Sequence, residues 1–318
     1  MISLPWYEQV GTQRTWFWRG WQIRYTYARP LGHDRVALSA PSADRVSPTP
    51  MILLHGFGAS LGHWRHNLEV FAESRSVYAL DLLGFGASQK APVLYNVGLW
   101  VDQVYHFWRT FIGQPVILVG NSIGSLIALA AAAAHPEMVK GLIMMSIPDP
   151  GVRTEMMPPT IQPIVGAIER FFISPLLLRP LFSILRRRGI IRAWLRVAYS
   201  HPERVTEDLV DMITQPTTDR GAARAFCLLC KGSSDPKFGT SVKKLLGSVD
   251  VDLPILLIWG KEDGMIPPRL ARPQDFVKYH PGLQLIELEG VGHCPQDECP
   301  EKVNPIILDW VGKVIGNR

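Results

Sequence analysis

Residues 115–130 read PVILVGNSIGSLIALA, and this stretch decides the fold. The apolar run PVILV is typical of a buried strand, the apolar, Ala-rich run after Gly124 is typical of a helix, and GNSIG joins the two without a spacer. A serine in such a tight turn needs small residues two positions to either side, because a Cβ there would collide with the crossing chain. Gly120 and Gly124 meet that requirement. The pattern predicts that Ser122 is a nucleophile, and the alternative is a hydroxyl that caps the helix N-terminus.

A serine hydroxyl is a poor nucleophile until a base takes its proton, so the chain should also supply a base and an acid that orients the base. The apolar run 254–260 is followed by Lys-Glu-Asp-Gly, which places Asp263 just beyond the carboxyl end of a strand. The next apolar run, 283–288, leads to Val-Gly-His-Cys, which places His293 likewise. We expect His293 to be the general base and Asp263 to orient it. Asp149 follows another predicted strand and is the alternative orienting acid.

A glycine-rich turn after the apolar run 51–54 predicts an oxyanion hole. Its sequence, His55-Gly56-Phe57-Gly58, lets backbone amides point inward. The amides of Phe57 and Ile123 are the expected donors to a developing oxyanion. We interpret His55 as a structural partner of the turn. A second glycine-rich segment, DLLGFGAS at 81–88, lacks the glycine spacing and the lysine of nucleotide-binding loops, so we interpret it as loop architecture.

Short apolar runs that alternate with helical patterns define the fold class. Runs without polar alternation are typical of strands covered on both faces, and strands that alternate with helices indicate a mostly parallel sheet with helices on both faces. The expected class is therefore α/β. An aromatic–polar alternation over residues 15–27, interrupted at Gly20, predicts an opening hairpin. The runs expected to form the rest of the sheet are 51–54, 77–80, 116–119, 142–145, 255–259 and 285–288.

This alternation is interrupted once, between about residues 150 and 248. The segment holds helical patterns rich in Leu and Arg, punctuated by prolines, and no apolar run of the strand type. We interpret 150–248 as a helical cap inserted into a core formed by 1–149 and 249–318. Because the cap follows a predicted strand directly, it should cover the carboxyl ends of the strands, where open α/β sheets hold their sites.

The composition excludes several classes of protein. With 318 residues, 47% hydrophobic and 19% charged, the chain is long enough for one large domain or two and is not disordered. Neither an eighteen-residue apolar run nor a leader-like start is present, so we expect an intracellular protein that does not span a membrane. Cys227 and Cys230 would suit a redox pair or half of a zinc site, but the other two cysteines lack ligand spacing. Buried free thiols are favoured, and no metal is expected.

Five segments resemble the α/β-hydrolase superfamily over nearly the whole chain, and within it the pheophytinase and chlorophyll dephytylase group of photosynthetic organisms. The most specific is the run C-P-x-D-E-x-P-E-x-V-N that starts directly after His293. The chain departs from the group at Ser125, where a second glycine is usual. The five segments are HGFGASLGHW (55–64), VYALDLLGFGAS (77–88), LWVDQV (99–104), GNSIGSLIALAAAAAHPEMVKG (120–141) and GHCPQDECPEKVN (292–304).

The resemblance implies an α/β-hydrolase fold and a Ser122, Asp263 and His293 triad in that chain order. It also implies that no cofactor is needed and that the substrate is a chlorophyll-type phytyl ester, which gives phytol and a free porphyrin carboxylic acid. A peripheral place on a photosynthetic membrane would follow from such a substrate.

The cap supplies candidate substrate contacts and a basic surface. Phe171, Phe172 and Leu176, with Phe57 of the core, are the expected substrate-binding residues, because this segment offers more apolar surface than a small polar ester needs. Arginines between the apolar residues, with no acid among them, suit docking on an anionic membrane surface. The alternative is that the leucines pack on the core and the arginines are solvated. The arginines are Arg170, Arg179, Arg186, Arg187, Arg188, Arg192 and Arg196.

Together these patterns predict a serine ester hydrolase that acts on a lipophilic small molecule through an acyl-enzyme, removes phytol from a chlorophyll-type pigment and has no nucleic-acid partner. Two alternatives remain open. A carbon–carbon bond hydrolase that acts on a ring-cleavage product also carries G-N-S-x-G, and a non-catalytic binding protein could use the same fold. Dehalogenase and epoxide-hydrolase chemistry is disfavoured, because those relatives have Asp at the position of Ser122.

Overall fold

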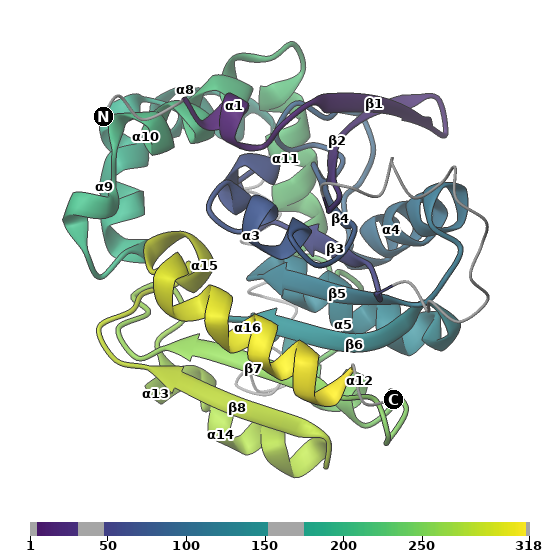
Figure 1. Ribbon diagram of the computed structural model, residues 1–318. Coiled ribbons are helices and arrows are strands. Elements are labelled where there is room, and N and C mark those ends of the chain that lie inside the picture. Colours follow the sequence, from purple (N-terminus) through teal and green to yellow (C-terminus); the bar gives the residue numbers. More distant parts are fainter. Residues whose placement is uncertain (1–4, 31–47, 152–174, 316–318) are drawn as a thin grey trace.

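One eight-stranded sheet forms the centre of the computed structural model, which describes residues 5–30, 48–151 and 175–315 (Figure 1). The strand order is β1-β2-β4-β3-β5-β6-β7-β8. β2 pairs antiparallel with both β1 and β4, and every neighbouring pair from β4 to β8 is parallel. The strands are β1 (Gln13–Trp18), β2 (Trp21–Ala28), β3 (Met51–Leu54), β4 (Val77–Leu80), β5 (Val116–Asn121), β6 (Val139–Met145), β7 (Ile255–Gly260) and β8 (Leu283–Leu288).

The strand predictions are confirmed. All six apolar runs form strands, and the aromatic segment near the start forms the expected hairpin, β1–β2. Its turn lies at Arg19 and Gly20, which both have positive φ, as turns of this kind require. β3, β5 and β7 are buried along their whole length, as expected of strands covered on both faces. The α/β class is therefore correct.

Helices cover both faces of the sheet because successive side chains of a strand point to opposite sides. Along β5, Leu118 packs in one hydrophobic layer, and Ile117 and Val119 pack in the other. The first layer holds side chains of α4, α5, α12 and α14, and the second holds side chains of α3 and α16 (Figure 1). The core helices are α1 (Trp6–Gln9), α3 (Leu68–Ala72), α4 (Val97–Phe111), α5 (Ile123–Ala134), α12 (Val242–Leu246), α13 (Pro268–Ala271), α14 (Pro273–Phe276), α15 (Pro295–Glu298) and α16 (Pro300–Val314).

Short 3₁₀ helices complete the connections. They are η1 (Leu61–Trp64), η2 (Pro136–Met138), η3 (Pro202–Arg204), η4 (Gln215–Thr218) and η5 (Val277–Tyr279). η1 follows the glycine-rich turn after β3, and the hydroxyl of Ser60 caps it by accepting from the Gly62 amide at 3.3 Å. This cap fixes the orientation of a segment that reaches the candidate site.

Further helices between β6 and β7 lie in the segment predicted to be the cap, 150–248. α12 lies in the same segment, but its side chains pack in the first layer of the core. Within 175–248 the structure describes helices and no strand. In Figure 1 the helices other than α12 lie at the end of the sheet toward which the arrows of β5 and β6 point, which is the carboxyl end. The Phe182 ring of α8 lies 5.0 Å from the Phe226 ring of α11, so the cap helices pack on one another. The cap helices are α8 (Pro175–Leu185), α9 (Arg188–Ala198), α10 (Glu207–Thr214) and α11 (Ala222–Ser233).

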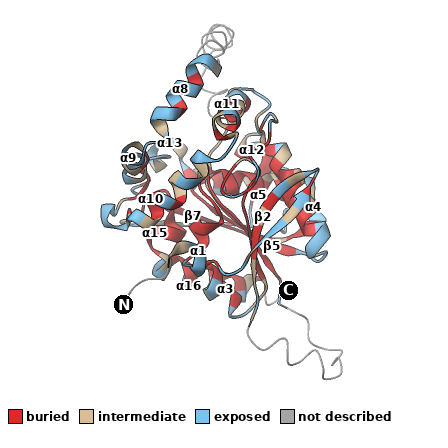
Figure 2. Cartoon of the chain, turned by 90° about the horizontal axis from the view of Figure 1, so that it is seen from above, coloured by how far each residue is buried: buried red, intermediate tan, exposed pale blue. Residues whose placement is uncertain are grey.

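The cap has an exposed outer side. Figure 2 shows α8 projecting beyond the core with mostly exposed residues, while the strands beneath are buried. Leu178 and Phe182, one turn apart, form its buried face. None of the helices in the described ranges has the length and apolar character needed to cross a bilayer.

Candidate active site

Ser122 stands at the tip of the turn between β5 and α5. Its φ of 54° and ψ of −123° lie in a region that non-glycine residues rarely adopt, and its amide donates to the Met145 carbonyl at 2.8 Å. A Cβ on Gly120 would overlap the backbone of Gly124, and a Cβ on Gly124 would overlap the Leu54 carbonyl. The steric reason expected from the sequence is confirmed, because the two glycines let β5 and α5 cross closely enough to hold the serine in a strained turn.

His293 and Asp263 form a buried pair. The Nδ1 atom of His293 lies 2.8 Å from Oδ2 of Asp263, and the two residues are 7% and 2% exposed. The other carboxylate oxygen of Asp263 accepts from the amides of Met265 and Ile266 at 2.9 and 2.7 Å. A carboxylate held by three donors cannot rotate freely, so it fixes the imidazole with Nδ1 as donor and leaves Nε2 free to act as a base.

Asp149, the alternative orienting acid, is used elsewhere. Its Oδ1 accepts from the amides of Gly151 at 2.8 Å and Val242 at 3.0 Å. Val242 is the first residue of α12, so Asp149 joins the start of the cap to the helix that follows it. The structure gives the histidine pairing to Asp263.

The two amides expected to form the oxyanion hole lie beside Ser122. Ile123 is the first residue of α5, and its amide therefore has no carbonyl one turn earlier in the helix to bond. An ideal Cβ on Gly56 would lie 3.3 Å from the Ser122 Cβ, so the turn that carries Phe57 passes directly beside the nucleophile. Both amides thus belong to the two turns that meet at Ser122.

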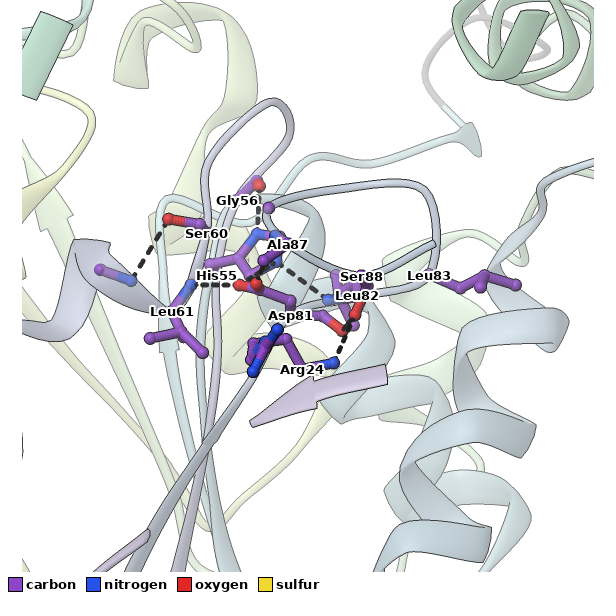
Figure 3. Close-up of polar contacts among 12 residues, drawn as sticks. Arg24, His55, Gly56, Ser60, Leu61, Asp81, Leu82, Leu83, Ala87 and Ser88 are labelled. Carbon is purple, nitrogen blue, oxygen red and sulfur yellow. Dashed lines mark hydrogen bonds and ion pairs between the residues drawn. The ribbon is translucent and has the colours of Figure 1, made fainter. Parts of the chain in front are cut away.

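His55 has the structural role expected from the sequence, within the cluster drawn in Figure 3. Its Nδ1 lies 2.7 Å from the Gly56 carbonyl, and its Nε2 lies 3.0 Å from the Leu82 amide. A carbonyl only accepts and an amide N–H only donates, so the ring is neutral with the proton on Nδ1. Burial lowers the pKa of His55 to about 3, which agrees with this state. His55 ties the oxyanion turn to the loop after β4.

Asp81 organises the second glycine-rich segment around the same cluster (Figure 3). Its two carboxylate oxygens accept from the amides of Leu61 at 2.6 Å and Ala87 at 2.7 Å. Burial raises the pKa of Asp81 to about 6. A Cβ on Gly86 would overlap this carboxylate, which explains the glycine. The interpretation of residues 81–88 as loop architecture is confirmed.

A cavity of about 420 Å³ lies between core and cap, and Ser122 and His293 both line it. Its walls are largely apolar, and its cap side is formed by α8, α9, α10 and α11. Residues that line it from the core are Gly56, Phe57, Gly58, Ala59, His63, Asn121, Ser122, Met265, His293 and Cys294. Those from the cap are Leu185, Ile191, Trp194, Leu195, Ala198, Ile213 and Phe226.

A second cavity of about 170 Å³ adjoins the first. The two share six lining residues, so they lie side by side as two adjacent compartments. The far compartment is bounded by α11 and by the loop at residues 84–86, together with the buried amine of Lys90. The shared residues are Phe57, Gly58, Leu185, Ile191, Ile213 and Phe226.

The predicted substrate-binding residues differ in their position relative to the cavities. Phe57 lines both compartments. Leu176 does not line either one. It is 86% exposed, because it lies on the face of α8 opposite the buried Leu178 and Phe182. Phe171 and Phe172 lie outside the described residues.

Several residues that support the site were missed from the sequence. Glu298 is fully buried and accepts from the amides of Gly292 at 2.7 Å and His201 at 2.8 Å, so it joins the loop of His293 to the cap segment that follows α9. Ser125 stands where the resembling group usually has a glycine. It lies behind the strand-to-helix turn that carries Ser122, the elbow, and its hydroxyl accepts from the Met145 amide at 2.9 Å. The adjacent acids Asp297 and Glu298 in the run CPQDE are the sequence signal from which buried hydrogen bonds near His293 could have been predicted.

The cysteines are free thiols. Cys294 lines the cavity beside His293, and burial raises its pKa well above the ordinary value, so it is a protonated and poor nucleophile. Cys227 and Cys230 lie one turn apart on α11, and burial raises both pKa values. Within the described residues no three His, Cys, Asp or Glu side chains are grouped to hold a metal ion.

Fold and site together define an α/β protein with a serine, histidine and aspartate gathered at the carboxyl ends of its strands. A sequence profile of the alpha/beta hydrolase fold family matches residues 49–300, and the chain belongs to this family.

Its relatives include several hydrolases. The chain is 25% identical over 316 residues to chloroplastic pheophytinase of Arabidopsis thaliana, a match that covers 87% of this chain and 64% of that protein. It is 40% identical over 100 residues to 2-hydroxymuconate semialdehyde hydrolase of a Pseudomonas species, which covers 30% of this chain and 35% of that one. Among solved structures, a serine hydrolase involved in carbazole degradation superposes with a TM-score of 0.72 at 19% identity and covers 94% of this chain and 98% of that one. The family and the first two relatives support a hydrolase, and the solved structure supports the fold.

Proposed function

We propose that the protein is a serine ester hydrolase for a lipophilic substrate. The observation that carries this proposal is one cavity wall that holds both a serine at positive φ and a buried histidine bonded at 2.8 Å to a buried aspartate. A side chain held in an unfavourable backbone conformation is maintained only where the surrounding structure imposes it, which is typical of a nucleophile.

The chemistry uses the chain's own groups. Ser122 attacks the ester carbonyl carbon while Nε2 of His293 takes the hydroxyl proton, and Asp263 stabilises the resulting imidazolium through Nδ1. The amides of Phe57 and Ile123 donate to the oxyanion, at roughly 3 kcal/mol of transition-state stabilisation each. His293 then gives its proton to the leaving alcohol, and the acyl group stays on the Ser122 oxygen. Water, deprotonated by His293, releases the acid and restores the serine.

A phytyl ester of a chlorophyll-type pigment is the substrate that we propose. Two observations support it. The cavity is apolar and a second, largely apolar compartment adjoins it, which suits an ester with a long hydrocarbon arm. The pheophytinase relative aligns along 87% of this chain. The products would be phytol and the free pigment carboxylic acid.

The test is a product analysis. The protein is incubated with chlorophyll a, pheophytin a and a short nitrophenyl ester, and the products are separated by chromatography. We expect pigment acid and phytol, and we expect Ser122→Ala to lower hydrolysis by at least about 10³-fold without a change in the unfolding temperature. Hydrolysis of the short ester alone would keep the esterase and exclude the pigment. An alanine variant with more than about a tenth of the activity would exclude the triad.

A carbon–carbon bond hydrolase is the second candidate. It is favoured by one observation, the 40% identity over 100 residues to 2-hydroxymuconate semialdehyde hydrolase. Such an enzyme would cleave a ring-cleavage product and leave phytyl esters intact, so the same assay with both substrates separates the two. If the chain were instead a binding protein, a fluorophosphonate probe would fail to label Ser122.

We further propose that the outer side of α8 and α9 docks on an anionic membrane surface, with a peripheral location on a photosynthetic membrane. Leu176, Ile184 and Val197 are each 47% exposed or more. Exposed arginines lie among them, and a basic apolar helix pair suits an interfacial position. The exposed arginines of α8, α9 and the turn between them include Arg179, Arg186, Arg187 and Arg196.

Two of the arginines counted from the sequence do not support this docking. Arg188 forms ion pairs with Glu207 and Asp211 of α10, and Arg192 pairs with Glu207. No acid lies among the cap arginines in the sequence, but acids from a helix further along the chain reach these two. The docking surface consists of Arg179, Arg186, Arg187 and Arg196.

A further inference from the structure

The loop that carries the catalytic histidine, residues 290–293, touches the end of the cap helix α9. The Ala198 carbonyl is one of the last four of α9, which have no partner within the helix, and it accepts from the His293 amide at 2.6 Å. An added Cβ on Gly292 would lie 2.3 Å from the same carbonyl oxygen, so backbone packs directly on backbone here. The position of the base is therefore tied to the position of the cap.

Glu298 of α15 links the same two segments through its side chain. Its Oε2 accepts from the Gly292 amide at 2.7 Å, and its Oε1 accepts from the His201 amide at 2.8 Å. The Ser200 hydroxyl lies 2.7 Å from Oε1 and 2.8 Å from the Gly290 carbonyl oxygen, and it adds a third link. One carboxyl group therefore joins the residue before the base to the cap segment that follows α9.

The hydrogen bonds of Glu298 require an acceptor at both oxygens. Backbone N–H groups only donate, and one of them is aimed at each oxygen, so a carboxylate fits this place. The side chain is fully buried, and an NH₂ group in place of one oxygen would set two donors against each other without water to separate them. Glu298 lines neither of the two cavities, so any effect on the reaction must pass through the loop that it holds.

We propose that Glu298 is a positioning residue for the catalytic base, which it holds in place by fastening the loop of His293 to the cap. The inference rests on the acyl-enzyme mechanism proposed above, in which Nε2 of His293 takes the Ser122 proton and then gives it to the leaving alcohol. Asp263 fixes the tautomer and rotation of the imidazole, whereas Glu298 fixes the backbone that carries the imidazole. Glu298 exchanges no proton. The cap then acts in catalysis by locating the base as well as by covering the cavity.

Two esters of the same acid distinguish a displaced base from a partly unfolded protein. The nitrophenolate of nitrophenyl butyrate leaves without a proton, whereas the leaving oxygen of ethyl butyrate must receive the proton of His293. Both esters need the base to activate Ser122, so the ratio of their kcat/KM values reports the proton transfer to the leaving group. A smaller folded fraction lowers both values equally and leaves this ratio unchanged.

Three variants are compared with the wild type by this ratio of nitrophenyl to ethyl ester. Glu298→Gln replaces an acceptor with a donor and should raise the ratio by about tenfold or more, part of the roughly 10²- to 10⁴-fold that a positioned acid or base contributes. Ser200→Ala removes one donor to Glu298 and should raise the ratio by about threefold. Glu262→Gln is the matched control, with a ratio within about twofold of wild type. Glu262 accepts from the Val291 amide of the same loop at 3.0 Å but belongs to the core, and a glutamine oxygen can accept in its place.

An unchanged ratio in Glu298→Gln, or an equal rise in Glu262→Gln, would overturn the inference, because the base would then not depend on the link to the cap. If circular dichroism shows that Glu298→Gln does not fold, Ser200→Ala decides, and an unchanged ratio in that variant overturns the inference. A wild-type protein that hydrolyses neither ester and is not labelled at Ser122 by a fluorophosphonate would overturn the proposed function and this inference with it. Wild-type hydrolysis of both esters with an unchanged ratio in the variants overturns only the role of Glu298.

Discussion

Asp263 and Asp149 both follow strands of the sheet, and their hydrogen bonds distinguish them. Asp263 receives Nδ1 of His293 at one oxygen and two backbone amides at the other. Within the described residues, Asp149 receives backbone amides through a single oxygen. An acid that orients a base must hold it through a bond that changes strength as the base becomes charged, and Asp263 alone of the two makes such a bond.

Conservative amide variants test this assignment. We expect Asp263→Asn to lower kcat/KM for a short ester by about 10³- to 10⁴-fold, because an amide can donate to His293 and so stabilise the wrong tautomer. Asp149→Asn should change kcat/KM by less than about threefold, since its amide oxygen can still accept from Gly151 and Val242. Steady-state kinetics and the unfolding temperatures of both variants provide the comparison. The reverse ranking would transfer the orienting role to Asp149.

The sequence alone was sufficient to predict the site residues that stand at recognisable positions along the chain. Ser122, Asp263 and His293 each stand just beyond an apolar run, and Phe57 and Ile123 stand in recognisable turns, so local patterns suffice to propose them. The partners of Glu298 could not be proposed in this way. Its bonds to Ser200 and His201 join residues 98 and 97 positions apart, and only the fold shows that they meet.

At the scale of elements, the close crossing of β5 and α5 depends on Gly120 and Gly124. At Gly124 the neighbouring atoms belong to the backbone of another strand and cannot move aside. The nearest atoms to a Cβ on Gly124 are backbone atoms of Leu54 and His55, in the strand β3 and directly after it. We expect Gly124→Ala to lower the free energy of unfolding by about 3 kcal/mol and to remove activity, because the sheet or the elbow must shift.

A matched glycine separates this crowding from the general effect of alanine. Gly312 lies on the exposed side of α16 with no atom within 4 Å of an added Cβ, so Gly312→Ala should raise the free energy of unfolding by about 0.5–1 kcal/mol. Denaturant unfolding of both variants gives the two values. Equal effects in the two proteins would contradict the crowding at the elbow.

The cap surface allows a second test at the element scale. Each basic residue near an anionic surface contributes roughly 1 kcal/mol, an attraction that falls as salt rises. We expect the combined change of Arg179, Arg187 and Arg196 to Gln to weaken binding to anionic liposomes by about tenfold or more at low salt and to slow hydrolysis of membrane-embedded pigment. Hydrolysis of a soluble short ester should stay within about twofold of wild type, because these three residues do not line the cavity.

The control for this test removes the same charge from the core. Arg109, Lys278 and Lys302 are exposed residues of α4, η5 and α16, and their combined change to Gln should leave liposome binding close to that of wild type. Sedimentation with liposomes of defined anionic content measures both proteins. Equal liposome binding by the cap variant and wild type would show that the arginines are solvated residues with no role in membrane docking.

At the scale of the whole molecule, the layers could be predicted from the sequence, but the contacts between distant segments of the chain could not. Buried strands could be predicted because a short apolar run bounded by turn residues, between longer helical patterns, is typical of a strand covered on both faces. The strand order, with β4 between β2 and β3, was not predicted, since nothing local to 21–28 or 77–80 states which strands pair. The same limit applies to Arg188 and Arg192, whose acidic partners lie on α10.

The molecule buries neutral histidines whose protons matter for its stability. Burial lowers the pKa of His55 to about 3 and that of His63 to about 4, from 6.5. Below pH 6.5 the two histidines therefore bind protons in the unfolded chain but not in the folded protein. Their contribution to the free energy of unfolding is present above this pH and is lost as the pH falls toward 4. Asp81 acts in the opposite direction, because its pKa of about 6 lets the folded protein bind one proton in the same range.

Two protons against one leave a net loss of stability on acidification. We expect the free energy of unfolding to fall by roughly 1.4 kcal/mol for each pH unit between about 6 and 4.5, one net proton's worth. His63→Gln removes one of the two histidines, so its slope over this range should be close to zero even if its stability at pH 7 is lower. Denaturant unfolding of both proteins at several pH values, at constant ionic strength, measures the slopes. A wild-type stability that is flat or rises from pH 6 to 4.5 would show that the buried rings take up protons without unfolding.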